Sequence, residues 1–204
     1  MTRSVLNWRD LGNPCPKHAL GYYQPMVWPQ GYGRPLDTNG ALRSPDLAAI
    51  LASRKSRRDF VAPATTEDLS ALFDLCARTR EVQISDLGFD LEFRQHPASG
   101  AIHSIHCLVQ EHGGEEWNRY DAIRHELVTL PGSSVAADEA RQAANDVVPT
   151  GSASLIALVA EPGKSAAKYD FHESLVWRDA GVILGYFSIA AEALGLAFCP
   201  LGIT

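Results

Sequence analysis

The chain has 204 residues, of which 46% are hydrophobic and 21% charged, with a formal net charge of −6 and a pI near 5.6. This balance is typical of a folded protein with one substantial core, and the acidic pI argues against general nucleic-acid binding. No stretch approaches the roughly 20 apolar residues of a membrane span, and residues 1–10 lack the pattern of a signal peptide. We therefore expect neither a membrane nor a nucleic acid as partner.

Residues 1–44 are predicted to form an irregular N-terminal arm, and residues 45–204 the folded domain. The arm holds much of the proline and glycine of the chain, which disfavours regular structure. It also carries five aromatic residues, Trp8, Tyr22, Tyr23, Trp28 and Tyr32. That number is too high for a disordered tail, so we expect the arm to pack on the body or on a partner subunit.

The predicted elements, in chain order, are a helix beginning at Ser44-Pro45-Asp46, a helix over 65–79, a strand over 105–110, a helix over 135–147, a strand over 155–160 and a helix over 172–195. Ser44 is the expected N-cap of the first helix, and Thr65 with Asp68 resembles a capping box. The last helix is apolar nearly all round from Ala180 onward and ends at Gly195, so it is buried centrally or at a subunit interface. Strands separated by long connections suggest mixed α+β layers.

Residues 54–58 read Arg-Lys-Ser-Arg-Arg, four cations and a hydroxyl in an acidic chain. Guanidinium groups donate forked, charge-assisted hydrogen bonds to phosphate oxygens, and serine adds a compact donor. The segment is therefore a candidate anion-binding site. The alternative is a solvated basic helix end that complements the helix dipole.

The cysteines and histidines do not predict a metal site. Cys15, Cys76, Cys107 and Cys199 are scattered without a C-x-x-C pair, so we expect free thiols in a reducing, cytoplasmic setting. His103 and His106 are three apart, which in a strand places their side chains on opposite faces. Without an acidic or thiol partner at ligand spacing, zinc is not expected.

Three more segments carry possible chemistry. His96-Pro97-Ala98-Ser99-Gly100-Ala101-Ile102-His103 leads into the strand over 105–110, Lys168-Tyr169 precedes the long helix, and the run from Glu192 to Gly202 ends it. With residues 54–58, these segments resemble in order and spacing the FMN-dependent nitroreductase superfamily, over residues 45–204. The closest likeness is to its SagB-like branch, which includes the azoline dehydrogenases.

The likeness is residue by residue. Arg54, Ser56 and Arg58 match the family's R-x-S-x-R phosphate motif. The second segment matches P-S-A-G-A-L-H/Y, with Ala98 and Ser99 in swapped order and Ile102 for leucine. The last segment matches the family's ALGLGTCPLGG ending.

The resemblance implies a nitroreductase-like α+β fold, with a central mixed or antiparallel sheet flanked by helices, and a homodimer with two FMN sites at its interface. The cofactor-binding residues it implies are Arg54, Lys55, Ser56, Arg58, Pro97, Ala98, Ser99, Gly100, His103, Pro200, Leu201 and Gly202. Lys168 and Tyr169 match a pair implicated in catalysis in the azoline-dehydrogenase branch, where a lysine or tyrosine near flavin removes a proton as hydride leaves. Surface packing is the alternative for this dipeptide.

Three functions compete at this point. The first is an FMN enzyme that moves hydride by ping-pong exchange between NAD(P)H and a small acceptor. The second is an azoline-type dehydrogenase acting on a modified peptide, which Lys168-Tyr169 favours. The third is a non-catalytic member of the fold that binds flavin or another ligand, which the swapped Ala98-Ser99 favours.

Overall fold

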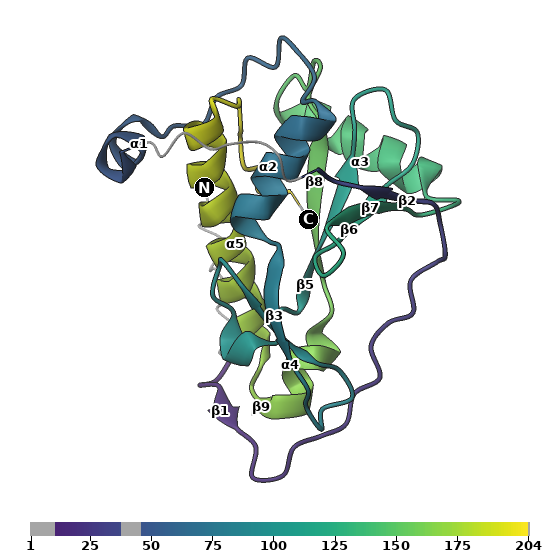
Figure 1. Ribbon diagram of the computed structural model, residues 1–204, viewed down its shortest axis with the longest axis vertical. Helices are drawn as coiled ribbons and strands as arrows, with labels where there is room; N and C mark the ends of the chain where they lie inside the picture. Colours follow the sequence, from purple (N-terminus) through teal and green to yellow (C-terminus); the bar gives the residue numbers. More distant parts are fainter. Residues whose placement is uncertain (1–10, 38–45, 204) are drawn as a thin grey trace, which may run out of the picture.

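A computed structural model describes residues 11–37 and 46–203 (Figure 1). Its elements are β1 (Cys15–Pro16), β2 (Gly33–Pro35), α1 (Leu47–Ser53), α2 (Thr66–Cys76), β3 (Thr79–Gln83), β4 (Leu91–Arg94), the 3-10 turn η1 (Ser99–Ala101), β5 (Ile105–Gln110), β6 (Asn118–Asp121), β7 (Glu126–Thr129), α3 (Ser134–Val147), β8 (Leu155–Ala160), α4 (Pro162–Lys168), β9 (Tyr169–Asp170) and α5 (Glu173–Leu194). The predicted α+β class is confirmed. None of the helices in the described residues is long and apolar enough to cross a membrane.

The central sheet has five strands in the order β2-β7-β6-β5-β8, and every neighbouring pair is antiparallel. The longest pairing joins β5 to β8, from Ile105 opposite Ala160 to Gln110 opposite Leu155. Two small ladders lie outside this sheet, β3 with β4 and β1 with β9. The sheet is thus antiparallel throughout.

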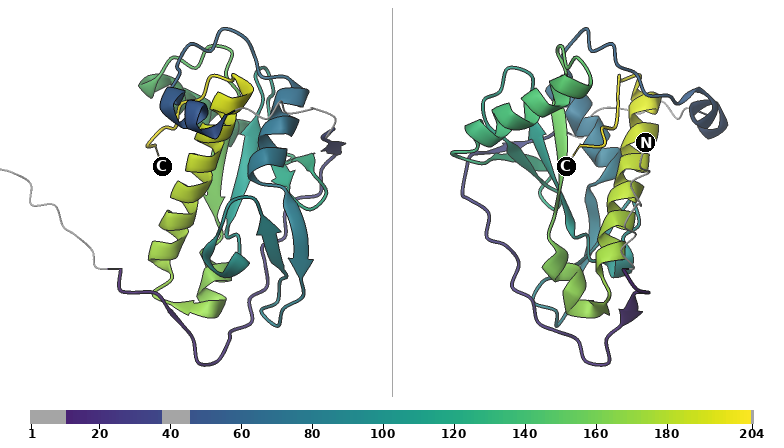
Figure 2. Two further views of the ribbon diagram at one scale, coloured as in Figure 1. Left: turned by 60° about the vertical axis from the view of Figure 1, so that its left-hand side comes forward. Right: turned by 180° about the vertical axis from the view of Figure 1, so that it is seen from behind.

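Helices cover both faces of the sheet (Figure 2). Alternate residues of β5, including Cys107 and Val109, face a core shared with α2 and α5. In that core the ring of Phe73 stacks on Tyr120 at 4.2 Å and meets Phe187 edge-on at 5.5 Å. Leu108 faces the other way, into a smaller core under α3. The fold is therefore a helix–sheet–helix sandwich, and α5, its longest helix, lies on one face of the sheet together with α2.

The described part of the arm runs along the outside of the body, from β1 at the lower end of Figure 1 to β2 at the upper end. Its middle is held by Glu161, a 4% exposed carboxylate that accepts hydrogen bonds from the Met26 N–H at 2.5 Å and the Tyr23 hydroxyl at 3.1 Å. The ring of His106 lies 2.7 Å from the same carboxylate. Residues 11–37 therefore pack on the body, and the division at residue 44 stays a prediction.

Local signals located most helix ends and both long strands. The strands at 105–110 and 155–160 are observed as predicted, and the capping box is present, with Thr65 and Asp68 each bonding the other's backbone N–H. Gly195 ends α5 in the left-handed conformation, with φ 73°. The N-cap prediction for α1 was wrong. Asp46 caps this helix, because its carboxylate accepts the Ala48 N–H at 2.9 Å, while Ser44 and Pro45 lie outside the described residues.

Candidate functional site

The basic segment after α1 divides into two kinds of cation. Arg57 donates two hydrogen bonds to Glu192 of α5, at 2.6 and 3.2 Å, and its backbone N–H donates to the Phe198 carbonyl. Arg54 and Arg58 are exposed and take part in no ion pair with any residue the structure describes. Arg57 therefore fastens the segment to the end of α5, which leaves Arg54 and Arg58 available to an anion.

The same contacts bring two distant sequence segments together. The predicted cofactor residues Ser56 and Arg58 flank Arg57, and the Arg57 backbone bonds to Phe198. Residues 54–58 are therefore fixed next to the run that leads into Pro200-Leu201-Gly202. The guanidinium of Arg57 also lowers the pKa of Glu192 by hydrogen bonding, so the pair stays ionised. We call residues 54–58 with 198–202 the C-terminal half-site.

The second half-site is built on the loop of residues 97–103, which has an unusual backbone. Gly100, Ala101 and His103 have φ values of 62°, 59° and 47°. Ala101 and His103 carry a Cβ, and the left-handed region costs such residues about 1–2 kcal/mol each. Strain of this kind persists only where surrounding contacts hold the backbone, and it is frequent at functional sites.

The predicted catalytic pair lies directly against this loop. A Cβ placed on Gly100 would come within 2.6 Å of the Tyr169 hydroxyl oxygen and 2.9 Å of the Lys168 Nζ. The absence of a side chain at Gly100 thus lets both polar groups approach the backbone of residues 99–101. The structure therefore brings together the second and third segments that the sequence singled out, although nearly 70 residues separate them.

The arm borders this half-site too. Cys15 and Pro16 of β1 pair with Asp170 and Tyr169 of β9, and the Lys17 N–H donates to the Lys168 carbonyl at 2.9 Å. An extended piece of chain thus lies beside the backbone of Lys168-Tyr169 and fixes its direction. We call residues 97–103 with Lys168 and Tyr169 the loop half-site.

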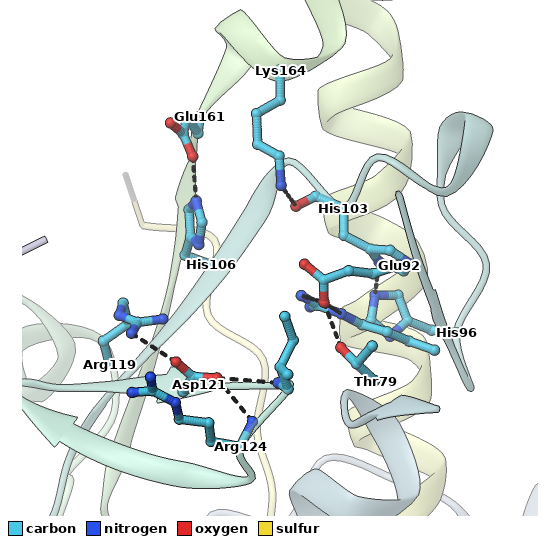
Figure 3. Close-up of polar contacts among 12 residues, drawn as sticks. Thr79, Glu92, His96, His103, His106, Arg119, Asp121, Arg124, Glu161 and Lys164 are labelled. Carbon is cyan, nitrogen blue, oxygen red and sulfur yellow. Dashed lines mark hydrogen bonds and ion pairs between the residues drawn. The ribbon is translucent and has the colours of Figure 1, made fainter. Parts of the chain in front are cut away.

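His103 is placed differently from the other predicted cofactor residues. It is 3% exposed, and its Nδ1 lies 3.1 Å from Nε2 of His96 (Figure 3). The Nδ1 of His96 lies 2.6 Å from the Cys76 carbonyl oxygen. Burial lowers the pKa of both rings, that of His96 to about 4, so both are neutral at pH 7. Lys164 donates to the His103 carbonyl at 3.3 Å. These contacts anchor the end of the loop, and a flavin contact by His103 stays a prediction.

The two half-sites lie along different parts of one helix. Asp179, near the start of α5, accepts bonds from Ser99 of the loop, whereas Glu192, near its end, accepts bonds from Arg57. These two acidic residues are 13 positions apart, which is about 20 Å along a helix that rises 1.5 Å per residue. Within one chain the half-sites are therefore held apart by the helix.

Sequence reasoning missed the residues that hold the arm and the two half-sites in place, namely Arg57, Glu161, Lys164, Asp179 and Glu192. Glu192 stood in the sequence as a single acid within the apolar stretch of the long helix, which is an unusual position for a charge unless it is bonded. Asp179 lies next to Arg178, directly before that stretch begins. The sequence could therefore indicate that an acid in this helix is bonded, but it could not indicate which residues bond to Asp179 and Glu192. The partners are 80 and 135 residues away.

Comparison with known proteins identifies the family of the chain. Residues 51–204 match the model of the nitroreductase family, so the chain belongs to that family. Membership points to flavin-dependent oxidoreductase activity in general. No protein with curated annotation matches the chain in sequence.

Two solved structures share the fold. A provisionally assigned nitroreductase from Ralstonia eutropha JMP134 is similar over 90% of this chain and 81% of its own, with a TM-score of 0.62 at 19% identity. Another, from Anabaena variabilis ATCC 29413, is similar over 86% of this chain, with a TM-score of 0.57 at 17% identity. The chain covers 33% of that second protein. At these identities the likeness shows the fold alone.

Proposed function

We propose that the protein is an FMN-dependent oxidoreductase that passes hydride by ping-pong exchange from NAD(P)H to a small acceptor. The observation that carries this proposal is the contact of Lys168 and Tyr169 with Gly100, which puts two groups able to carry a proton at a small, side-chain-free surface. When bound, FMN supplies the hydride-accepting and hydride-donating ring.

The donor set suits the two ends of FMN. Arg54, Ser56 and Arg58 offer guanidinium and hydroxyl donors to a phosphate dianion, and the two arginines are exposed without ion-pair partners among the described residues. Lys55 is a further exposed cation that can reach the ribityl or ring oxygens. At Gly100 the side chains of Lys168 and Tyr169 take the space that a Cβ would fill, so we place the flavin ring on the loop backbone beside them. Pro97, Ala98, Ser99 and Gly100 are proposed to face one side of the ring, and Pro200, Leu201 and Gly202 the other.

A homodimer would unite the two half-sites. Because α5 holds them about 20 Å apart, we propose that each flavin lies between the C-terminal half-site of one copy and the loop half-site of the other. Helix α1 supports this proposal, since it projects from the body (Figure 2) and has no buried residue. Its Leu47 and Leu51 are 61% and 54% exposed. Exposed apolar side chains on a helix that has no buried residue suit burial against a partner subunit.

Lys168 and Tyr169 are proposed to manage the proton that accompanies hydride transfer. The Lys168 ammonium lies 5.7 Å from the centre of the Tyr169 ring, so the cation stands close to the phenol. Backbone bonds from Lys17 and β1 fix the direction of the dipeptide. A substrate placed over the loop would then meet both groups from one side.

The test of the proposal is flavin retention. Purified protein is incubated with FMN, desalted and examined by visible absorption, and its mass in solution is measured. We expect a flavin band at one FMN per chain in a dimer, and we expect Arg54→Ala with Arg58→Ala to raise the FMN dissociation constant by at least about 100-fold, because two charge-assisted phosphate contacts are lost.

The matched control removes two other arginines, Arg80 and Arg124, whose side chains are 49% and 74% exposed. This pair changes the net charge equally, so it should leave the FMN affinity within about two-fold. Equal loss in both double variants would reduce the effect to general electrostatics. A folded wild-type dimer that retains no flavin would refute the proposal.

A second candidate is an azoline-type dehydrogenase that acts on a modified peptide. The observation in its favour is the antiparallel ladder of β1 on β9, since an extended segment already lies beside Lys168-Tyr169. NAD(P)H oxidation with a quinone or nitroaromatic acceptor supports the first function. Flavin reduction by an azoline-containing peptide, in the absence of nicotinamide, supports the second.

A further inference from the structure

Asp179 is the charged residue that α5 buries, with 6% of its surface exposed. Its carboxylate accepts the Ser99 backbone N–H at 3.1 and 3.2 Å and the Ser99 hydroxyl at 2.9 Å. It forms no ion pair with any cation of the described residues. A buried carboxylate without a counter-ion is costly, and it is tolerated only where hydrogen bonds replace its hydration. All the bonds that the structure gives it come from one residue of the loop half-site.

The loop needs such a constraint. Ser99 directly precedes Gly100 and Ala101, and both of these adopt left-handed φ values. Free of contacts, residues 99–103 would relax toward the more favourable right-handed or extended regions. The Asp179 carboxylate fixes the start of the loop, and Lys164 fixes the His103 carbonyl at its end. Between these two points the backbone of Gly100 is held against Lys168 and Tyr169.

We propose that Asp179 is a positioning residue that holds the 99–103 backbone in the conformation required for cofactor binding and for contact with Lys168 and Tyr169. This inference rests on the proposed function for its catalytic consequence. Its structural consequence, a loop ordered before the cofactor binds, does not depend on that function. The bonds to Ser99 are charge-assisted, so they constrain the loop more strongly than neutral ones would.

The experiment compares Asp179→Ala, Asp179→Asn, Ser99→Ala and the double variant Asp179→Ala with Ser99→Ala. The first readout is amide hydrogen exchange of residues 99–104 in the protein without FMN. We expect exchange there to accelerate at least about ten-fold in Asp179→Ala, with α2 and β5 unchanged, because the loop loses its charge-assisted bonds. Asp179→Asn keeps the shape and an acceptor oxygen, so it should rescue part of the protection.

The second readout is the FMN dissociation constant, which rises in proportion to the loss of the competent loop conformation. We expect a rise of about ten-fold or more in Asp179→Ala and a smaller one in Asp179→Asn. Adding Ser99→Ala to Asp179→Ala should accelerate the loop exchange no further, because the Ser99 hydroxyl acts on the loop through its bond to Asp179. Asp138→Ala is the matched control, since it truncates an exposed aspartate of α3.

The outcomes separate the two proposals. If wild-type protein binds no FMN, and loop exchange is fast only in the Asp179 variants, the proposed function is refuted and the positioning role of Asp179 stands. Wild-type FMN binding, with unchanged exchange and affinity in Asp179→Ala, overturns the positioning role. If Asp179→Ala does not fold, Asp179→Asn decides in the same way, because it removes the charge of the carboxylate that accepts the Ser99 bonds; unchanged exchange and affinity in this variant also overturn the role.

Discussion

Gly100→Ala tests the contact on which the proposed mechanism depends. The new methyl group has two consequences that the structure separates. Alanine at φ 62° is strained by about 1–2 kcal/mol, which for a chain of this size lowers the melting temperature by roughly 2–8 °C. The methyl carbon would also stand 2.6 Å from the Tyr169 hydroxyl and 2.9 Å from the Lys168 Nζ, so both groups must move by about 0.5–1 Å to reach ordinary contact distance.

A displacement of that size at reacting groups costs about 100-fold in rate. We therefore expect FMN-loaded Gly100→Ala to lose about two orders of magnitude in kcat for NAD(P)H oxidation with a quinone acceptor. Both displaced groups are the ends of flexible side chains, so the loss of stability should stay near the backbone strain alone. Activity and stability are measured on the same preparation, by steady-state kinetics and thermal unfolding.

Gly113→Ala is the matched control. Gly113 has a similar φ of 75°, but nothing lies within 4 Å of the position its Cβ would take. It should lose the same 1–2 kcal/mol of unfolding free energy and keep its activity. If both variants kept full activity, Lys168 and Tyr169 would not act through the loop; if both lost it equally, the effect would be general destabilisation. Either result would refute the reasoning.

Two further predictions concern stability. Since burial lowers the pKa of His96 from 6.5 to about 4, the unfolded chain binds a proton that the folded chain does not as the pH falls below 6.5. Unfolding free energy should therefore drop by about 2 kcal/mol between pH 7 and pH 5 from this group, in the same direction as from His103, and urea titrations at the two pH values check it. Phe73→Ala should cost about 3–5 kcal/mol, because it empties the space between Tyr120 and Phe187; a loss below 1 kcal/mol at constant m-value would contradict the described core.

Local chemistry explains what could be predicted from the sequence. The capping box at Thr65 and Asp68, the strand over 105–110 and the glycine end of α5 each depend on residues within a few positions of one another. The first helix start was misplaced for a local reason too, since Ser44 and Asp46 are both good N-caps and only the backbone decides between them.

The contacts that assemble the half-sites are long-range, and no local pattern encodes them. Ser99 bonds to Asp179, which is 80 residues away in the sequence, and Arg57 bonds to Glu192, which is 135 residues away. The resemblance assigned phosphate binding to Arg54 and Arg58 and gave Arg57 no role. Only the fold shows that Arg57 is bonded to Glu192 of α5.

Helix α5 explains why the two half-sites keep a fixed relation. A helix of 22 residues packed through Ile183 and Phe187 into the main core is a rigid element, and it bonds one half-site through Asp179 and the other through Glu192. Two copies packed so that the loop half-site of each faces the C-terminal half-site of the other would complete both flavin sites, while the Asp179 and Glu192 bonds stay within each chain. Since each bond belongs to a different half-site, loss of Asp179 should affect the loop and loss of Glu192 the phosphate-binding arginines. The proposed dimer thus predicts that a mixed dimer of the two variants keeps one of its two sites intact.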